Sequence, residues 1–234
     1  MNGMERIDKK NTMIKLDDAM ANLKKAMALQ LEVMEQQYVN SGNNEKKQEI
    51  ERRKKAYESN IENSGMEGEE KTQKFSDLED RGSETMEKMI KRCEKFVNGT
   101  KRNLILAGAV GVGKTHLACA VAKALGLRRD KNFHIIRCST VEAVDLLDSR
   151  KYIVILDDMG RELGTSTKIA ARRAIICEII EKRDRLGLIT IVTTNMGTKE
   201  MILVFKAHIY DRLVKNSDVP ARVELDSYRQ KKGL

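Results

Sequence analysis

Short runs rich in apolar residues recur along the second half of the chain, separated by helix-forming segments. The apolar runs occupy residues 104–107, 132–137, 152–158 and 188–192. The intervening segments of helical composition occupy residues 117–125, 140–147 and 168–185. Each apolar run has the length of a buried strand and is too short to cross a bilayer. The alternation of strand and helix predicts a parallel sheet with helices on both faces, an α/β fold.

The first hundred residues show a different pattern, which is typical of helices without strands. Apolar side chains three and four residues apart predict an amphipathic helix with a methionine-rich face, formed by Met13, Leu16, Met20, Leu23, Met27 and Met34, with Gln30 at a skipped position. A second helix is predicted from residue 45 to about residue 60, but it is polar nearly all round. The methionine-rich face therefore has two interpretations, packing on the neighbouring helix or binding another protein. The polarity of the second helix favours a protein partner.

The connection between the two halves is rich in Gly, Ser and Glu, a composition that predicts a flexible linker. After it, Ser83 is expected to cap a helix. The apolar face of this helix consists of Met86, Met89, Ile90, Cys93, Phe96 and Val97. The predicted organisation has three parts: a helical partner-binding segment at 1–62, a flexible linker at 63–82 and an α/β domain at 83–234.

Residues 108–115 read GAVGVGKT, a complete G-x-x-x-x-G-K-[ST] phosphate-binding loop between a predicted strand and a predicted helix. Glycines in such a loop allow positive φ and bring backbone N–H groups close to phosphate oxygens. Lys114 would reach the β- and γ-phosphates, and the Thr115 hydroxyl would bind Mg²⁺. The predicted nucleotide-binding residues are Gly108, Gly111, Val112, Gly113, Lys114, Thr115 and His116. The alternative, a glycine turn that merely enters a helix, explains fewer of these positions. ATP is the expected cofactor.

Polar side chains end the next two apolar strands. Asp157 and Asp158 end one, and Asn195 follows the other. Because ligands of open α/β sheets bind beyond the carboxyl ends of the strands, these side chains should meet the phosphates. Asp157 would hold Mg²⁺ through water, and Asp158 would orient or deprotonate the attacking water. Asn195 would bond the γ-phosphate or that water. The alternatives are an acidic strand end and, for Asn195, a turn or helix cap.

Arg212 lies on a further predicted helix, and the phosphate site already has a cation in Lys114. A guanidinium offered to the γ-phosphate of a neighbouring subunit would explain it, and such a contact speeds hydrolysis by several powers of ten. An ordinary surface ion pair is the alternative.

Charge and cysteine content narrow the functional classes. The net charge is +9, and residues 101–234 hold 25 basic and 15 acidic side chains, so the whole excess lies in the α/β half. A positive field of this kind favours a nucleic-acid partner, although lysines spread over a solvated surface are the alternative.

The four cysteines form no C-x-x-C pair, which argues against zinc and is typical of reduced thiols in the cytoplasm. The amino terminus lacks the apolar region of a signal peptide, and we expect no membrane span.

Five motifs in order resemble the DnaC/DnaI/IstB group of AAA+ ATPases. They are GAVGVGKTHLA (108–118), ILDDMG (155–160), TTNM (193–196), DRL (211–213) and DSYR (226–229). The resemblance covers about residues 86–234. It implies that Lys114, Thr115 and Asp157 bind Mg-ATP, that Asp158 is the catalytic acid, Asn195 sensor 1 and Arg212 the arginine finger. It also implies an AAA+ sheet without the C-terminal lid domain, and self-association through AAA+ interfaces.

The sequence departs from the group at two positions. Many relatives have Glu where Asp158 stands, and many have Arg where His208 stands. The cysteine cluster of DnaI-like N-terminal domains is absent as well.

Two activities of the group compete, with a third class beside them. A helicase loader would bind a hexameric replicative DNA helicase through the N-terminal helices and single-stranded DNA through the AAA+ domain, using ATP hydrolysis as an assembly switch. An IstB-like helper would act on duplex DNA and activate a transposase. The THLA and TTN segments resemble IstB proteins, whereas Asn195-Met196 and DSYR resemble DnaC. The methionine-rich helix favours the loader. A small-molecule P-loop kinase would leave Arg212 and the basic excess without a role.

Overall fold

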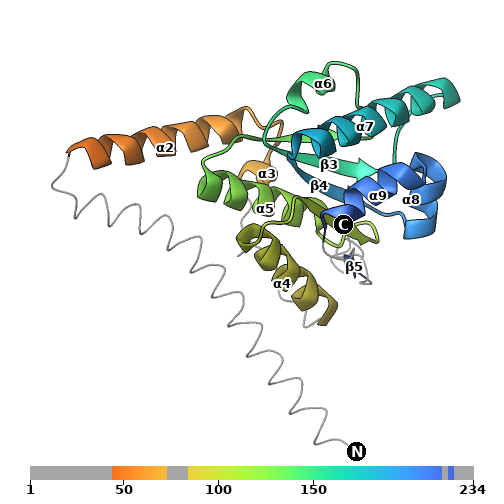
Figure 1. The fold of residues 1–234 in the computed structure, drawn as a ribbon, viewed down its shortest axis with the longest axis horizontal. Helices are drawn as coiled ribbons and strands as arrows, with labels where there is room; N and C mark the ends of the chain where they lie inside the picture. Colours follow the sequence, from red (N-terminus) through yellow and green to blue (C-terminus); the bar gives the residue numbers. More distant parts are fainter. Residues whose placement is uncertain (1–43, 73–83, 218–220, 224–234) are drawn as a thin grey trace, which may run out of the picture.

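The computed structural model of this chain describes residues 44–72, 84–217 and 221–223 (Figure 1). The predicted methionine-rich helix, the Ser83 cap and the motif at 226–229 lie outside these residues.

The centre of the molecule is a five-stranded parallel sheet with the strand order β2-β3-β4-β1-β5. The strands are β1 (Asn103–Gly108), β2 (Phe133–Arg137), β3 (Ile153–Met159), β4 (Ile189–Thr194) and β5 (Ala221–Val223). Side chains of β1 and β4 are buried along their whole length, because helices cover both faces. The predicted α/β sheet is confirmed.

One face of the sheet is covered by α4 (Glu84–Asn98) and α5 (Lys114–Arg129). The apolar face predicted for α4 is buried here through Met89, Ile90, Cys93, Phe96 and Val97. The end of α2 (Asn44–Glu62) adds Tyr57 and Ile61 to the same cluster. Burial of each large apolar side chain contributes about 1.5–3 kcal/mol.

The other face is covered by α7 (Ser166–Leu186), α8 (Thr198–Phe205) and α9 (Ala207–Lys215) (Figure 1). Side chains of β1 alternate between the two cores: Leu104 and Leu106 face α5, whereas Ile105 faces the second cluster. Among the described residues, no helix has both the length and the apolar character needed to span a bilayer.

Two predicted helix limits were wrong. Residues 140–147 form turns that lead into a single helical turn, α6 (Asp145–Asp148), because the Asp145 carboxylate accepts the Glu142 N–H at 2.7 Å and caps a turn instead. Gly126 does not end α5, which continues to Arg129 and ends at Asp130 with φ 50°. Gly126 is needed for close packing, since a Cβ there would lie 2.6 Å from the Phe133 ring.

Residues 63–72, predicted to belong to a flexible linker, are packed against the domain. Ser64 and Met66 are buried, and the Ser64 carbonyl accepts the Ile135 N–H of edge strand β2 at 2.8 Å. A short helix, α3 (Glu69–Thr72), follows. The polar composition of residues 63–72 predicted a solvated segment. Instead, the backbone of this segment covers the edge of β2 that has no neighbouring strand among the described residues. The outer domain boundaries stay predictions.

Candidate nucleotide site

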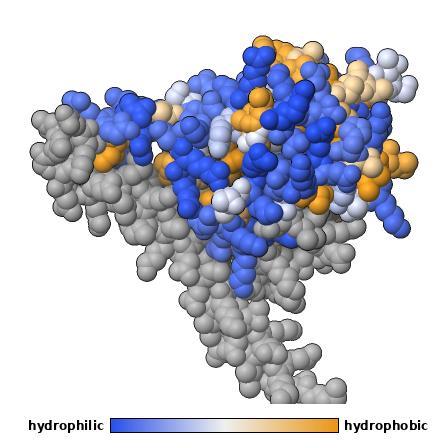
Figure 2. All heavy atoms as spheres, in the orientation of Figure 1, coloured by the Kyte–Doolittle hydropathy of each residue, from blue (hydrophilic) through white to orange (hydrophobic). Residues whose placement is uncertain are grey.

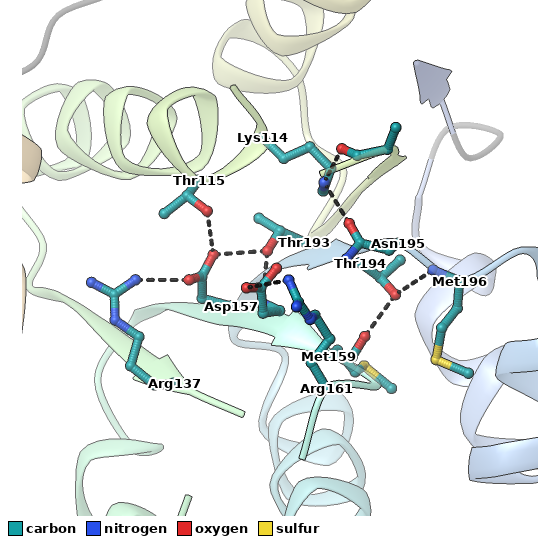
Figure 3. Close-up of polar contacts among 12 residues, drawn as sticks. Lys114, Thr115, Arg137, Asp157, Met159, Arg161, Thr193, Thr194, Asn195 and Met196 are labelled. Carbon is teal, nitrogen blue, oxygen red and sulfur yellow. Dashed lines mark hydrogen bonds and ion pairs between the residues drawn. The ribbon is translucent and has the colours of Figure 1, made fainter. Parts of the chain in front are cut away.

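The phosphate-binding loop joins β1 to α5 at the carboxyl edge of the sheet (Figure 3). Gly111 and Gly113 have φ of 79° and 92°, a region that favours glycine. The Val112 side chain is buried in the core, so this residue can offer a ligand only its backbone N–H. His116 is half-buried in the first turn of α5.

Lys114 is held among three oxygens. Its Nζ donates to the Gly108 carbonyl at 3.1 Å, the Ala109 carbonyl at 2.8 Å and Asn195 Oδ1 at 2.7 Å. Desolvation lowers the pKa of Lys114, and the charges of Asp158 and Asp157 partly oppose that shift. Phosphate oxygens are stronger acceptors than these groups for an ammonium ion. The site thus places a partly desolvated cation where β1 and β4 end.

Asp157, at the end of β3, accepts three hydrogen bonds and is 5% exposed. Its Oδ1 accepts from the hydroxyls of Thr115 and Thr193, each at 2.8 Å. Its Oδ2 accepts from Arg137 Nη1 at 2.7 Å (Figure 3). These bonds hold the Asp157 carboxylate beside the Thr115 hydroxyl, the group with which Asp157 is predicted to bind Mg²⁺.

The donor set fits a magnesium ion that is also bound by nucleotide. A hydroxyl and a carboxylate are hard oxygen ligands, and Mg²⁺ in nucleotide sites takes one or two protein ligands plus phosphates and water. No group of three or more His, Cys, Asp or Glu side chains among the described residues has metal-site geometry. Thr115 and Asp157 would therefore hold the ion only together with the phosphates.

Asp158 differs from its neighbour in backbone and in environment. Its φ is 54°, and the pairing of β3 with β4 shifts register between Leu156 and Met159. The Asp158 N–H donates to Thr193 Oγ1 at 2.8 Å, and its carboxylate lies 4.0 Å from Arg161 Nη1. Burial and the charge of Asp157 raise the pKa of Asp158. A left-handed non-glycine residue is costly, and such strain concentrates at functional sites.

The end of β4 supplies the other polar groups. Asn195 faces Lys114, and the Thr194 hydroxyl donates to the Met159 carbonyl at 2.7 Å and accepts the Met196 N–H at 3.1 Å. The structure thus brings Lys114, Thr115, Asp157 and Asn195 together as predicted (Figure 3).

Two further residues belong to this cluster and were not among the predicted site residues. Thr193 bonds both Asp157 and the backbone of Asp158, and Arg137 ends β2 at the same edge of the sheet. Thr193 lies in the TTNM motif, and Arg137 is the only Lys, Arg, Asp or Glu of β2. Their position at strand ends was the available signal.

Arg212 lies away from this cluster. It is on α9, where its Nη1 contacts Asp184 Oδ2 of α7 at 3.0 Å and its side chain is 37% exposed. The Arg212 carbonyl accepts from the side chain of Asn103, the first residue of β1. Because β1 runs from Asn103 towards the phosphate-binding loop, Arg212 lies at the opposite end of the strand from Lys114.

Comparison with known proteins agrees with this architecture. The sequence model described as "IstB-like ATP binding protein" matches residues 45–234. This chain belongs to that family. The predicted place within the DnaC/DnaI/IstB group of AAA+ proteins is thereby confirmed, and membership of this ATP-binding family supports ATPase activity in general.

The curated relatives are replicative helicase loaders. The chain is 28% identical over 153 residues to the replicative helicase loader DnaC of Escherichia coli strain K12, a match that covers 59% of this chain and 60% of that protein. It is 25% identical over 170 residues to the loader of Buchnera aphidicola subsp. Acyrthosiphon pisum, covering 65% and 67%. The chain thus spans about 60% of the length of the Escherichia coli protein.

Solved structures share the fold. A crystal structure of DnaI aligns with a TM-score of 0.56 and 24% identity, over 70% of this chain and 94% of that one. A primosome component of Streptococcus pyogenes serotype M3 aligns with a TM-score of 0.57 and 17% identity, over 73% and 98%. The DnaC helicase loader aligns at 0.53 and 18%, over 63% and 95%.

Proposed function

We propose that this chain is an ATP-dependent loader of a hexameric replicative DNA helicase. The observation that carries the proposal is the convergence of Lys114, Asp157 and Asn195 at the strand ends of a domain whose curated relatives are replicative helicase loaders. Those relatives favour the loader over the IstB-like transposition helper.

The nucleotide site has a division of labour among its side chains. Lys114 binds the β- and γ-phosphates and leaves its present oxygens to do so. Thr115 and Asp157 hold Mg²⁺, which would supply charge neutralisation of the phosphates. Asp158 orients the attacking water and takes its proton, while Asn195 positions the γ-phosphate.

Asp158 reaches the water through an unusual backbone. Its φ is left-handed and its N–H donates to the Thr193 hydroxyl, whereas Asp157 remains paired with Arg137 of β2. Asp158 has a shorter side chain than the Glu of many relatives. It extends from the end of β3, where the strand has a bulge.

The partners are assigned to different parts of the chain. The methionine-rich segment within 1–62 binds the helicase, because methionine faces adapt to other proteins. The AAA+ domain carries the net +10 of residues 101–234 and binds single-stranded DNA. Such a loader acts in the cytoplasm, and hydrolysis serves as its assembly switch.

Affinity capture tests the partner. The tagged full chain, expressed in its native cells, should recover a hexameric helicase. A variant that lacks residues 1–43 should recover at least tenfold less of the helicase. Purified helicase should then remain on single-stranded DNA circles after incubation with the loader and ATP, measured by co-sedimentation.

The matched control for nucleotide dependence is Lys114→Ala, which should bind the helicase but leave the circles bare. Recovery of a transposase in place of the helicase would replace the loader by the transposition helper.

A further inference from the structure

Arg137 bridges two carboxylates that come from different parts of the chain. Its Nη1 donates to Asp157 Oδ2 at 2.7 Å, and its Nη2 contacts Glu70 Oε2. The side chains are 30% exposed for Arg137, 20% for Glu70 and 7% for Asp157. The guanidinium is therefore shared between the metal-binding carboxylate and α3.

The helix that carries Glu70 is tied to the same domain by its backbone. Lys123 of α5 donates to the Glu70 carbonyl at 2.7 Å and to the Lys71 carbonyl at 3.2 Å. The Glu70 carboxylate also accepts the Glu67 N–H at 3.0 Å, so it forms the first turn of α3 as well as the pair with Arg137. A displacement of Glu70 would alter the structure of α3 and the environment of Arg137 together.

We propose that the Glu70–Arg137 pair couples residues 63–72 to the metal-binding end of the nucleotide site. Arg137 is a positioning residue that competes with the divalent cation for Asp157, and Glu70 restrains that competition. This inference rests on the proposed function in one respect, that the site takes Mg-ATP.

Charge alone sets the direction of each effect. A divalent ion beside Asp157 is repelled by the positive charge of Arg137, which already satisfies Asp157 Oδ2. Glu70 offsets that charge and offers the guanidinium a second acceptor. Loss of the Glu70 charge should disfavour the metal, whereas loss of the Arg137 charge should favour it. The hydroxyls of Thr115 and Thr193 still orient Asp157 without Arg137.

The coupling works in both directions. If α3 changes the affinity for metal-bound nucleotide, then nucleotide must change the stability of α3 by the same factor. Residues 63–72 follow α2, which in turn follows the segment proposed to bind the helicase. A partner that displaces α2 would thus change the affinity for Mg-ATP through Glu70.

Two substitutions with opposite signs test the proposal in the full-length chain. The measurement is the free Mg²⁺ concentration needed for half-maximal binding of a fluorescent ATP analogue. Glu70→Gln keeps the shape and removes the charge, and it should raise this concentration about fivefold. Arg137→Met should lower it by a similar factor. In the Arg137→Met background, Glu70→Gln should have no further effect, because its target is gone.

Matched controls separate charge at this site from charge in general. Glu69→Gln makes the same change on an exposed residue of α3, and Arg150→Met makes the same change on an exposed arginine; neither should move the midpoint. Circular dichroism melting checks that each variant is folded. A weaker Mg²⁺ requirement in Arg137→Met is an outcome that loss of structure does not produce.

Hydrogen exchange supplies a second readout that does not depend on hydrolysis. Exchange of the amides at 64–72 should change when Mg²⁺ and the analogue are added, and much less with the analogue and a chelator. Arg137→Met should abolish that difference. Equal midpoints in all variants, or a higher midpoint in both, would overturn this inference and leave the proposed function intact. Failure of the unaltered chain to bind the analogue would overturn both.

Discussion

At the scale of single residues, two adjacent aspartates show how environment assigns different chemistry to one side chain. Asp157 is buried, accepts three hydrogen bonds and stays in register with Arg137 of β2. Asp158 leaves the register with positive φ, is bound through its backbone, and has a carboxylate that is 40% exposed. The buried one is suited to fixed metal binding, and the exposed one, with its raised pKa, to proton transfer.

Lys114 and Asp158 should separate nucleotide binding from turnover. Lys114→Ala removes the cation at the β- and γ-phosphates and should weaken ATP binding at least tenfold. Asp158→Asn keeps the shape, and it should retain ATP affinity within about threefold while losing at least a hundredfold in turnover, because the proton acceptor is gone. Titration with a fluorescent analogue and a phosphate-release assay measure the two.

Lys101→Ala, an exposed lysine that precedes β1, is the matched control and should behave as the unaltered chain. Unchanged ATP affinity in Lys114→Ala would remove the assignment of the phosphate-binding loop.

At the scale of secondary-structure elements, Arg183 connects α7 to the first residues of the neighbouring strands β3 and β4. Its guanidinium is 0% exposed and donates to the backbone carbonyls of Ser149, Lys151, Tyr152 and Ile189 and to the Thr190 hydroxyl. Burial lowers the pKa of Arg183. The planar group satisfies carbonyls where β3 and β4 begin, and so fixes the two strands whose opposite ends build the site.

Substitution of Arg183 should therefore destabilise the domain. Arg183→Met leaves several buried carbonyls without donors, and we expect a loss of about 2–4 kcal/mol in the free energy of unfolding, measured by urea denaturation. Arg183→Lys should recover only a part, because an ammonium lacks the five donors of a fork.

Arg185→Met, on an exposed position of the same helix, should cost less than about 0.5 kcal/mol. A similar small cost for Arg183→Met would show that the network is not important for stability.

At the scale of the whole molecule, the sheet separates the nucleotide site from Arg212. The phosphate-binding loop follows the carboxyl end of β1, while the Arg212 backbone is bonded by Asn103 at the other end. Within one chain Arg212 is held by Asp184 of α7. If it acts on ATP, it must act on the ATP of a neighbouring subunit, after exchange of Asp184 for a phosphate.

Mixing two inactive variants tests that arrangement. Arg212→Ala should bind ATP normally and hydrolyse it at least a hundredfold more slowly, because only the transition state loses the cation. Mixed with Lys114→Ala, which keeps the arginine, it should regain part of its ATPase activity at interfaces between the two variants.

The control is the double variant Lys114→Ala with Arg212→Ala, which should give no rescue. Assembly of each mixture is followed by sedimentation. Near-normal activity of Arg212→Ala alone would mean that the contact with Asp184 is its whole role.

The sequence by itself determined four of the five described strands and the phosphate-binding loop, because these depend on local patterns; β5 was not predicted. A buried parallel strand must be apolar, and a loop that wraps phosphate needs glycine, Lys and Thr at fixed spacing. These constraints located β1, β3 and β4 within a residue or two, and they placed Lys114, Thr115, Asp157 and Asn195 in one cluster.

Tertiary structure decided what depends on contacts between segments distant in sequence. Arg137 and Thr193 bond Asp157 from β2 and β4. Their positions at strand ends place them at the same edge of the sheet, but only the folded structure shows which residue each one bonds. Residues 63–72 are polar and rich in Gly and Glu, yet they fold, because an exposed strand edge and Lys123 satisfy their backbone. Gly126 lies inside α5, where the Phe133 ring leaves no room for a Cβ. Local composition does not predict such contacts, because the residues that form them come together only when the sheet has formed.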